Sequence, residues 1–559
     1  MLSGARLDPL TPGPRARGAG ATLIPTNTHL NEVIAHANRP HPTSPGGPSQ
    51  GCPHRKGSSM EYVTPRPDPM TNADARRSAL AAAERLRTLS ETERDMIRLA
   101  NSPGFRRWLA QIHNIGGCAH PIYLAGRTTV HDRESGEILR HYDTANEPGG
   151  RLAVRCRNRR ETRCQPCSYL HAGDTFQLVR AGLAGGKGTP GRVRGHPRLF
   201  VTLTAPSFGA VHRATTNGER CQPRRDGGDC EHGRRIGCGA AHGDGDALVG
   251  QPLCVDCYDY TGHVLWHAYA GRLWNRFCDM VRRNLATSAG IAQSKFAEHA
   301  RLSFAKVAEY QQRGAVHFHS VIRLDGPSGP DAAPPAWGTG KLLDGVVREA
   351  AATVTVPVPY SAAFGERSVR WGRQVDVHAI RAFGGPSPVK DDAVAAYVAK
   401  YVGKSVSDAG GIDYRISSVG EIPRFSINSH LRALMGTCWR LGGLRELEPL
   451  RLRAWAHTLG YRGHVLTKSR AYSTTYAELR AARAEYHGVA GGEAVGGADT
   501  VTESGWRYVG SGHTPAEAEL AAGIAEDLAV LREIRHDRTV KGGRREGRVQ
   551  QAADTDSDR

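Results

Sequence analysis

Apolar and polar residues in the middle of the chain follow a pattern that predicts two adjacent strands. The apolar run from Ala315 to Leu324 predicts one strand, and Lys306 to Gln311 predicts its partner. Between them, Gln312-Arg313-Gly314 predicts a tight hairpin turn, with glycine where positive φ is needed. Because successive side chains of a strand point to opposite faces, His317 and His319 would present both imidazoles on one face.

Helical patterns follow and precede this hairpin. Asp391 to Lys404 begins with acidic residues, continues with alanines and ends with lysines, which suits a helix and its dipole. On that helix Tyr397 and Tyr401 share a face, as do Lys400 and Lys404. Further helices are predicted as a pair over 73–113, and singly over 427–441, 447–459 and 515–535, the last one amphipathic.

The register of the hairpin decides whether a carboxylate joins the two histidines. If the loop has an odd number of residues, Glu309 lies opposite His317 on the same face of the sheet. A loop that is one residue longer or shorter would place the Glu309 side chain on the opposite face. Two imidazoles and one carboxylate with open positions would hold a divalent cation. The alternative is a histidine pair that is only hydrogen-bonded.

The tyrosine pair suggests nucleophilic chemistry. A phenol is a poor nucleophile at neutral pH until a cation stabilises the phenolate, and a metal bound to a phosphate makes that phosphate easier to attack. Two tyrosines on adjacent helical turns could act in sequence; the alternative is a buried pair with its hydroxyls at the rim. Val402 to Ser405 is similar to the end of a phosphate-binding loop, but Val398 stands where that loop requires glycine, so no nucleotide-hydrolysing motor is expected.

These motifs resemble those of the HUH endonuclease superfamily, specifically rolling-circle replication initiators, and most closely the initiators of actinobacterial plasmids and integrative elements. Family motif one, an apolar strand ending in Thr-Leu-Thr, matches Leu199 to Thr204. Motif two matches His317-Phe318-His319, and motif three matches Tyr397 to Lys404, all in family order.

The resemblance implies an α+β fold in which a central antiparallel sheet carries the histidines and flanking helices include one with the tyrosines. It implies Tyr401 as the primary nucleophile and Tyr397 as its partner. We expect Lys400 and Lys404 to stabilise phosphate or phenolate charge. Glu309, His317 and His319 are expected to hold Mg²⁺ or Mn²⁺.

The expected reaction is site-specific nicking and joining of origin DNA that is single-stranded or extruded as a cruciform. A 5′-phosphotyrosine would form, and a host polymerase, with a host helicase, would extend the released 3′ hydroxyl. A second copy of the chain is a possible partner, and no membrane is expected. A two-tyrosine transposase or a relaxase would use the same site, and a zinc-dependent DNA-binding regulator would need none of its chemistry. The sequence leaves these alternatives open.

Twelve cysteines point to structural zinc. The N-terminal sequence lacks the apolar core of an export signal, and no uninterrupted apolar stretch could span a membrane, so reduced thiols and a cytoplasmic location are expected. Two Cys-x-x-Cys pairs have the spacing of zinc knuckles. The first predicted ligand set is Cys118, Cys156, Cys164 and Cys167, and the second is Cys230, Cys238, Cys254 and Cys257, with Cys221, His232 and His242 as rivals.

The cysteines also allow another assignment. The two Cys-x-x-Cys pairs could instead form one site of Cys164, Cys167, Cys254 and Cys257. Cys52, Cys278 and Cys438 are expected to be plain buried or tail thiols, and Cys278 lies in a helix-like run with Trp274 and Phe277.

Composition agrees with a DNA-binding protein without establishing one. A net charge of +19 and a pI near 9.6 predict salt-sensitive affinity for phosphate backbones. Residues 461–475 mix cations, hydroxyls and aromatics, which suits phosphates and stacked bases, although a solvated basic loop is the alternative. The expected DNA contacts are Arg313, Arg462, Lys468 and Arg470.

Composition along the chain also suggests domains. With 66 glycines and 32 prolines, long irregular segments are expected. The expected order is a disordered segment 1–70, with Met60 or Met70 as alternative starts; a helical region 71–115; a first zinc-binding region 116–194; a nickase domain 195–405 with a zinc-binding insertion 215–260; a helical and basic DNA-contact region 406–488; and a linker, amphipathic helix and disordered tail 489–559.

Overall fold

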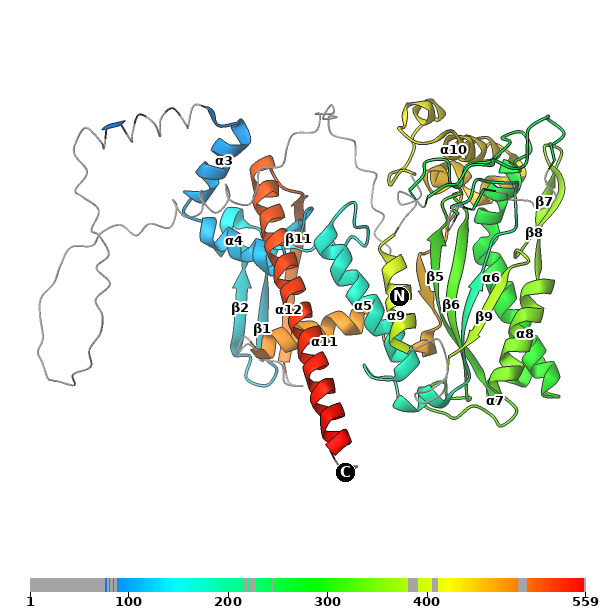
Figure 1. The fold of residues 1–559 in the computed structure, drawn as a ribbon. Helices are drawn as coiled ribbons and strands as arrows, with labels where there is room; N and C mark the ends of the chain where they lie inside the picture. The colour runs from blue at the N-terminus through cyan, green and yellow to red at the C-terminus, as the bar shows by residue number, and fades with distance from the viewer. Residues whose placement is uncertain are drawn as a thin grey trace, which may run out of the picture. The chain divides into compact units, whose positions relative to one another are not determined.

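The structure is a computed structural model (Figure 1). It describes residues 88–215, 219–221, 228–243, 245–380, 391–404, 411–490 and 500–556, together with positions 76, 77, 80 and 84. The expectations for residues 1–70 and for Cys52 lie outside the described residues, as does the predicted linker from residue 491 to residue 499, while its first two residues, 489 and 490, end a helix. The chain divides into two compact units. The smaller draws on residues up to Thr128, on Tyr142–Val154 and on residues from Ser504 onward, and the larger on Thr129–His141 and Arg155–Glu503.

The smaller unit combines helices with an antiparallel sheet. Its helix pair confirms the pattern seen in the sequence, and α12 packs against both members of the pair. The strands were not expected, and α12 continues to Asp556, where a disordered tail was predicted from about residue 540. The elements are α3 (Glu91–Ala100), α4 (Phe105–Asn114), β1 (Ile122–Asp132), β2 (Ile138–Asp143), β3 (Leu152–Val154), β11 (Thr500–Ser511) and α12 (Pro515–Asp556), with sheet order β11-β1-β2 and β3 paired to β1.

The larger unit is built on a five-stranded sheet in which every neighbouring pair is antiparallel. The mixture of helices and antiparallel sheet agrees with the predicted α+β class. The two strands of the hairpin lie inside the sheet, next to the strand of motif one. The strands are β4 (Arg198–Leu203), β5 (Arg301–Tyr310), β6 (Val316–Asp325), β9 (Val375–Ala379) and β10 (Leu466–Lys468), in the order β10-β5-β6-β4-β9.

Helices cover both faces of this sheet, as Figure 1 shows. One face packs against α6 (Tyr260–Ser288) and α8 (Gly340–Thr353), with Phe318 from β6 in the apolar core between them. The other face packs against α5 (Gln165–Ala184) and α9 (Asp391–Val402), with Val321 from β6 in a second core. Because side chains alternate along β6, this one strand supplies both cores.

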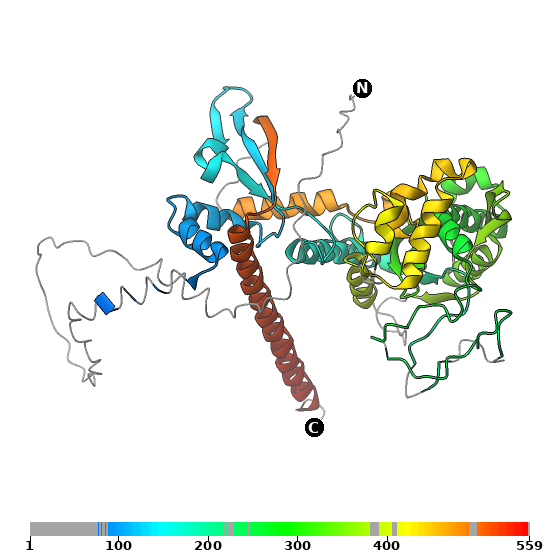
Figure 2. The ribbon, with the colours of Figure 1, turned by 90° about the horizontal axis from the view of Figure 1, so that it is seen from above.

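The remaining elements lie around these layers. In Figure 2 the helical region that includes α10 (Ser429–Leu441) packs on α6. The insertion between β4 and α6 is an irregular stretch with isolated β-bridges. Smaller elements are α7 (Phe296–His299), β7 (Thr355–Ser361), β8 (Gly365–Arg370) and α11 (Tyr476–Ala490). In the part of the chain that is described, no helix is both long and apolar enough to cross a bilayer.

Two predicted segments differ from the sequence pattern in their details. Residues 447–459, predicted as one helix, form two 3-10 helices, Arg445–Leu450 and Leu452–Thr458. Arg451 between them has a left-handed φ of 50°, which ends the first segment, and Pro449 lies inside that segment. Part of the basic stretch at 461–475 is β10, an edge strand paired to β5.

A buried ion pair holds the tyrosine helix to the sheet. Arg198 on β4 is fully buried, and its guanidinium donates to Asp391 Oδ1 at 2.8 Å and to the carbonyl of Leu183 at 2.6 Å. Asp391 is the first residue of α9, so the pair fixes the N-terminus of that helix. A buried guanidinium is costly unless it is paired. Here Nη1 has one carboxylate and one carbonyl as partners, while Nε and Nη2 are buried without a hydrogen-bond partner among the described residues.

We expect Arg198→Met to lower the free energy of unfolding by about 3–5 kcal/mol, because it leaves the Asp391 carboxylate buried without its cation. Urea unfolding followed by circular dichroism measures this. The double variant Arg198→Met/Asp391→Asn should recover part of the loss. A cost for the single variant no larger than that of an exposed Arg→Met change, such as Arg432→Met, would show that the pair does not fix α9.

Another buried side chain, His267, joins α6 to the hairpin. Its Nδ1 lies 2.8 Å from the carbonyl of Leu459, and its Nε2 accepts a hydrogen bond from the N–H of Val316 at 3.0 Å. The first contact requires a proton on Nδ1 and the second a lone pair on Nε2, so the ring is neutral. Burial lowers the pKa of His267 to about 4.

The folded pKa of His267 lies below its ordinary value, so the unfolded chain binds the extra proton between about pH 6.5 and pH 4. Stability should therefore fall as pH falls through this window. His267→Leu should remove this contribution to the pH dependence and cost roughly 2–4 kcal/mol at pH 7, because two buried backbone groups lose their partner. Thermal unfolding at pH 5 and pH 7 measures both effects, with exposed His299→Leu as the control. Equal pH slopes in wild type and His267→Leu would contradict the assignment.

Candidate active site

The β5–β6 hairpin has the register that places a carboxylate beside the histidines. Glu309 pairs with His317 across the two strands. The turn is closed by a hydrogen bond from the N–H of Gly314 to the carbonyl of Gln311, and Gly314 has a φ of +75°. The glycine turn predicted from the sequence is therefore confirmed, and of the two registers that the sequence left open the structure has the one with an odd loop.

Glu309, His317 and His319 bring three donor atoms to one point on the face covered by α9. Glu309 Oε2 lies 2.8 Å from His317 Nε2 and 3.0 Å from His319 Nε2, and the two imidazole nitrogens are 3.0 Å apart. His319 is buried, while the other two are partly exposed. Two imidazole nitrogens and one carboxylate oxygen converging in this way form a donor set that fits a divalent cation.

The charges of this triad favour cation binding. Burial opposes ionisation of Glu309, but hydrogen bonds from His317 and His319 outweigh it and lower the pKa of the carboxyl to about 2. Burial also lowers the pKa of His319, against the opposing effect of Glu309. A carboxylate and a neutral imidazole are the forms that bind metals, and the shifts of Glu309 and His319 favour these forms.

The strand of motif one orients His319. Thr202 Oγ1 on β4 lies 3.0 Å from His319 Nδ1, and the two residues pair across the β4–β6 ladder. Phe200 on the same strand stacks parallel to the His319 ring, with centroids 5.9 Å apart. With an ion bound, donation of the Nδ1–H to Thr202 would leave the Nε2 lone pair of His319 for the ion. Thr202 was identified in the sequence only as part of a strand motif, because its role depends on strand pairing.

Helix α9 presents both tyrosines to the triad. The Tyr397 hydroxyl lies 3.2 Å from His319 Nε2, and the Tyr401 ring stacks against His319 with centroids 5.7 Å apart. The two phenol rings are 4.7 Å apart. Burial, together with hydrogen bonding to Tyr401, raises the pKa of Tyr397 above its ordinary value. The helix and its shared tyrosine face are therefore as the sequence predicts.

Two lysines and one arginine surround the end of this helix. Lys404 Nζ is 3.8 Å from Glu309 Oε1 and 4.6 Å from the centre of the Tyr401 ring, while Lys400 Nζ is 5.8 Å from that ring. Arg159 donates to the carbonyls of Val402 at 3.1 Å and Lys404 at 2.8 Å. Arg159 therefore caps the C-terminus of α9, where a cation is favoured. Its residue type gives no indication of this role in the sequence.

The predicted DNA-contact residues have different surroundings. Arg313 points into the protein and donates to the carbonyls of Pro206 and Ala205, each at 3.2 Å, so it supports the hairpin turn. Lys468 is half-buried and donates to the carbonyl of Ser473 at 2.8 Å. Arg462 and Arg470 are exposed. For all four residues, contact with DNA stays a prediction.

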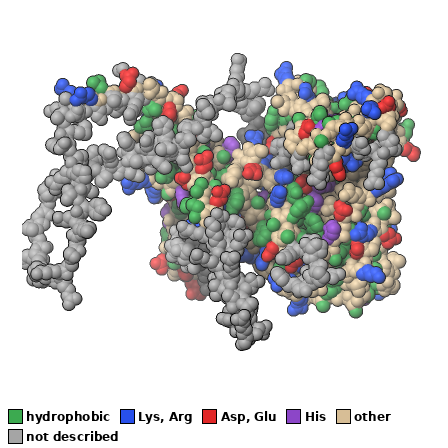
Figure 3. Space-filling model, in the orientation of Figure 1, with side chains coloured by type: hydrophobic (Ala, Val, Ile, Leu, Met, Phe, Trp, Pro, Cys, Tyr) green, Lys and Arg blue, Asp and Glu red, His purple; other side chains and the backbone are tan. Residues whose placement is uncertain are grey.

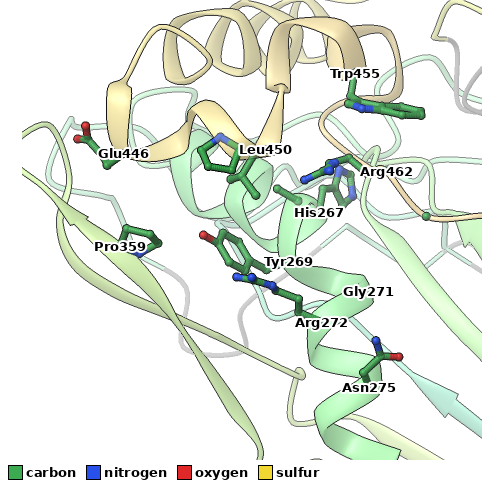
Figure 4. A pocket seen from close by; sticks show the side chains of 13 residues that line it. His267, Tyr269, Gly271, Arg272, Asn275, Pro359, Glu446, Leu450, Trp455 and Arg462 are labelled. Atoms are coloured by element: carbon green, nitrogen blue, oxygen red, sulfur yellow. The ribbon is translucent and has the colours of Figure 1, made fainter. Parts of the chain in front are cut away.

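Arg462 also lines a cavity of about 690 Å³ beside α6. Figure 4 shows Tyr269 and Arg272 from α6 in its wall, with Arg462 and Trp455 on the side facing them. The cavity lies on the α6 side of the sheet and the triad on the α9 side, so the two are separate features. On the face of the molecule seen in Figure 3, lysine and arginine side chains are scattered among acidic ones.

The cysteines and histidines form groups in the larger unit that could hold metal ions. Cys156, Cys164 and Cys167 have their thiols close together, just before or at the start of α5. Cys118, predicted as their fourth ligand, belongs to the smaller unit, where it is buried. Cys278 and Cys438 are buried thiols, as expected.

The insertion holds two further groups, and they divide its ligands differently from the sequence prediction. The first group is Cys230, His232, Cys254 and Cys257. His232, which the sequence offered as an alternative ligand, therefore takes the position that was predicted for Cys238. Cys238 instead lies with His242 and His212. The spacing of the cysteines and histidines along the sequence could not show which ligands belong to which group, because irregular loops bring them together. The single-site alternative of Cys164, Cys167, Cys254 and Cys257 does not match these groups.

Comparison with known proteins adds to this geometry. Residues 104–526 match the protein family described as replication initiator protein, pSAM2. A replication initiator protein from Streptomyces ambofaciens is 45% identical over 452 residues, which cover 78% of this chain and 94% of the relative. No solved structure matches the chain. The family match spans the triad, the tyrosine helix and the insertion.

The contact between Thr202 and His319 generates a prediction about cation binding. Thr202→Val should weaken Mn²⁺ binding about ten- to a hundredfold, because His319 loses the partner that sets its tautomer and ring orientation. Isothermal titration of the full chain with Mn²⁺ measures this. Thr204→Val, two residues along β4, loses only a bond to the carbonyl of Gln374 and is the matched control. Equal Mn²⁺ affinity in both variants would exclude this role for Thr202.

Proposed function

The chain belongs to the replication initiator protein family of pSAM2, and we propose that it starts replication of a plasmid or integrative element by nicking and rejoining origin DNA through a phosphotyrosine. The observation that carries this proposal is the convergence of Glu309, His317, His319 and two tyrosines at one point on the sheet. The sheet that carries the histidines and the helix that carries the tyrosines support an HUH-type nickase fold over 195–405, all within the larger unit.

Glu309, His317 and His319 would hold the Mg²⁺ or Mn²⁺ that this chemistry uses. Their three donor atoms already lie within 3.0 Å of one another in pairs, so they need no rearrangement of the strands to share one ion. A bound divalent cation supplies electrophilic activation of the phosphate and helps to offset its negative charge. Thr202 and Phe200 hold the buried His319 in place for that purpose.

Tyr401 is the proposed primary nucleophile. Its phenolic oxygen forms a bond to the phosphorus of the scissile phosphodiester, and the bond from phosphorus to the 3′ oxygen breaks. The phenol proton passes to water, and the departing 3′ oxygen takes up a proton to become a hydroxyl. The 5′ end stays on Tyr401 as a phosphodiester, so the bond energy is conserved and no nucleotide hydrolysis is needed. Lys404, beside the Tyr401 ring, would stabilise the phenolate.

Tyr397 is the proposed second nucleophile. It lies one helical turn before Tyr401 and shares the same triad, so it can attack the site that is regenerated after one circuit of synthesis. Rejoining reverses the first step: the new 3′ hydroxyl attacks phosphotyrosine and frees the phenol. Lys400 would stabilise phosphate charge during either step.

The proposed partners follow from this reaction. Single-stranded or cruciform origin DNA is the substrate, a host polymerase extends the exposed 3′ hydroxyl, and a host helicase separates the strands. The net charge of +19 favours association with DNA, and Arg313, Arg462, Lys468 and Arg470 stay predicted contacts. The family match favours an initiator over a transposase or relaxase with the same site.

Structural zinc is proposed for the cysteine groups. Cys156, Cys164 and Cys167 would bind one ion, with Cys118 as the fourth ligand proposed from the sequence. Cys230, Cys254 and Cys257 would bind another, completed by His232. Because Arg159 lies between Cys156 and Cys164, the first ion would also steady the residue that caps α9.

We expect full-length protein incubated with end-labelled single-stranded oligonucleotides from its element's origin, with Mn²⁺, to give a covalent protein–DNA band on denaturing gels. Tyr401→Phe should reduce the band strongly, and Tyr401→Phe/Tyr397→Phe should abolish it, because no phenol remains at the triad. Tyr360→Phe, an exposed tyrosine on β7, is the matched control and should leave the band unchanged.

Chelation and a binding assay complete the test. EDTA should remove the adduct while leaving DNA binding measurable by fluorescence anisotropy. If the double variant binds DNA as wild type does and wild type itself forms no adduct on any origin oligonucleotide, the protein is a DNA-binding regulator and the nicking proposal fails.

A further inference from the structure

The insertion between β4 and α6 contains a cluster of donor atoms that the proposed nicking does not use. His242 Nε2 lies 3.2 Å from His212 Nδ1 and 3.3 Å from Cys238 Sγ. All three donor atoms lie within 4.8 Å of one another. We propose that His212, Cys238 and His242, with Cys221, bind a zinc ion of their own, separate from the ion at Cys230, His232, Cys254 and Cys257.

The side chain of His242 is arranged as a metal ligand would be. It is buried, and its Nδ1 lies 2.6 Å from Asp246 Oδ2. A carboxylate that accepts the Nδ1–H of a histidine fixes the tautomer and aims the Nε2 lone pair at the ion. Here that lone pair faces Cys238 and His212, whose donor atoms are of the types that zinc prefers.

Cys221 is the fourth ligand in this proposal. Its Sγ lies outside the group whose donor atoms are all within 4.8 Å of one another, so it must move closer when the ion binds. Cys221 is fully buried, and its backbone N–H donates to the carbonyl of Ala240, between Cys238 and His242. Its carbonyl accepts from the N–H of Cys238 at 3.1 Å. Its Sγ accepts from the N–H of Arg213, the residue after His212, at 3.3 Å. Cys221 is therefore bound to the loops on both sides of the cluster, and the set becomes two thiolates and two imidazoles.

A hydrogen-bonded network without an ion is the competing explanation, and the composition of the insertion argues against it. The described residues between β4 and α6 form no helix and only isolated β-bridges. Among them, the large apolar side chains that are buried are Phe208 and Tyr258, near the two ends. A loop with so small an apolar core needs cross-links to keep one conformation, and bound zinc supplies folding free energy directly.

The cluster lies beside the hairpin that carries the proposed active site. His212 exchanges backbone hydrogen bonds with Gly250 and Gln251, each at 2.9 Å. A Cβ on Gly250 would come within 2.4 Å of the backbone at Gln312, so this loop is in direct contact with the turn between β5 and β6. The ion therefore supports the turn from outside, together with Arg313, and makes no contact with the triad.

Zinc content of the full chain tests the assignment by inductively coupled plasma mass spectrometry, on protein purified with Zn²⁺ and then freed of loosely bound metal. We expect His212→Ala, His242→Ala and Cys238→Ser each to lose about one zinc ion per chain relative to wild type. His232→Ala should lose about one as well, and His212→Ala/His232→Ala about two, since the ligand sets share no residue. His299→Ala and Cys278→Ser are matched controls that should keep the full content.

Retention of the wild-type zinc content by both His212→Ala and His242→Ala would overturn the proposal. If those variants do not fold, zinc-edge X-ray absorption of the wild-type chain decides the question, because Zn–N distances near 2.0 Å separate from Zn–S distances near 2.3 Å. More nitrogen ligands around zinc than His232 alone would supply support the site. A coordination shell made almost entirely of sulfur overturns it. Neither measurement depends on nicking, so the outcome is independent of the proposed function.

Discussion

The register of the β5–β6 hairpin is the constraint on which the rest of the candidate site depends. Side chains alternate strictly along a strand, so a shift of one residue would move a donor atom to the opposite face. In the observed register Glu309 pairs with His317, and His319 lies two residues further along. The opposite alternation places Phe318 in the core under α6. The donor triad on one face and the core packing on the other therefore require the same pairing, and neither can change without loss of the other.

The tyrosine helix α9 is held at both ends, and this fixes the position of its two phenol groups relative to the triad. Arg198 binds Asp391 at the N-terminus, and Arg159 binds the last carbonyls at the C-terminus. Between these anchors the apolar face of α9 packs on the sheet. Two consecutive turns can then present two phenols to one set of donor atoms. A helix held at one end only would leave the relative positions of the phenols and the triad to thermal motion.

Local patterns in the sequence were enough for the hairpin, its glycine turn and the tyrosine helix, because each depends on neighbouring residues. Features that depend on distant pairing were not predictable. Strand β11, near the C-terminus, pairs with β1, near the N-terminus. The sequence of β10 has the composition of a basic loop, and only its pairing with β5 shows that it is a strand. His212 precedes Cys221 without any knuckle spacing, so only the folded loops reveal its neighbours. The hydrogen bonds of Arg313 to the carbonyls of Pro206 and Ala205 likewise depend on folded loops and have no signal in the sequence.

The way the insertion leaves and rejoins the fold has an evolutionary consequence. The N–H of Asp259 donates to the carbonyl of Phe208 at 2.7 Å, and that of Leu253 to the carbonyl of Ala210 at 2.9 Å. The segment thus begins and ends at neighbouring points and is closed by its own stem. A gene that gained, lost or exchanged the segment would encode the same sheet with the same pairing. Homologues could therefore differ here in length and ligand composition without a change in the pairing of the sheet.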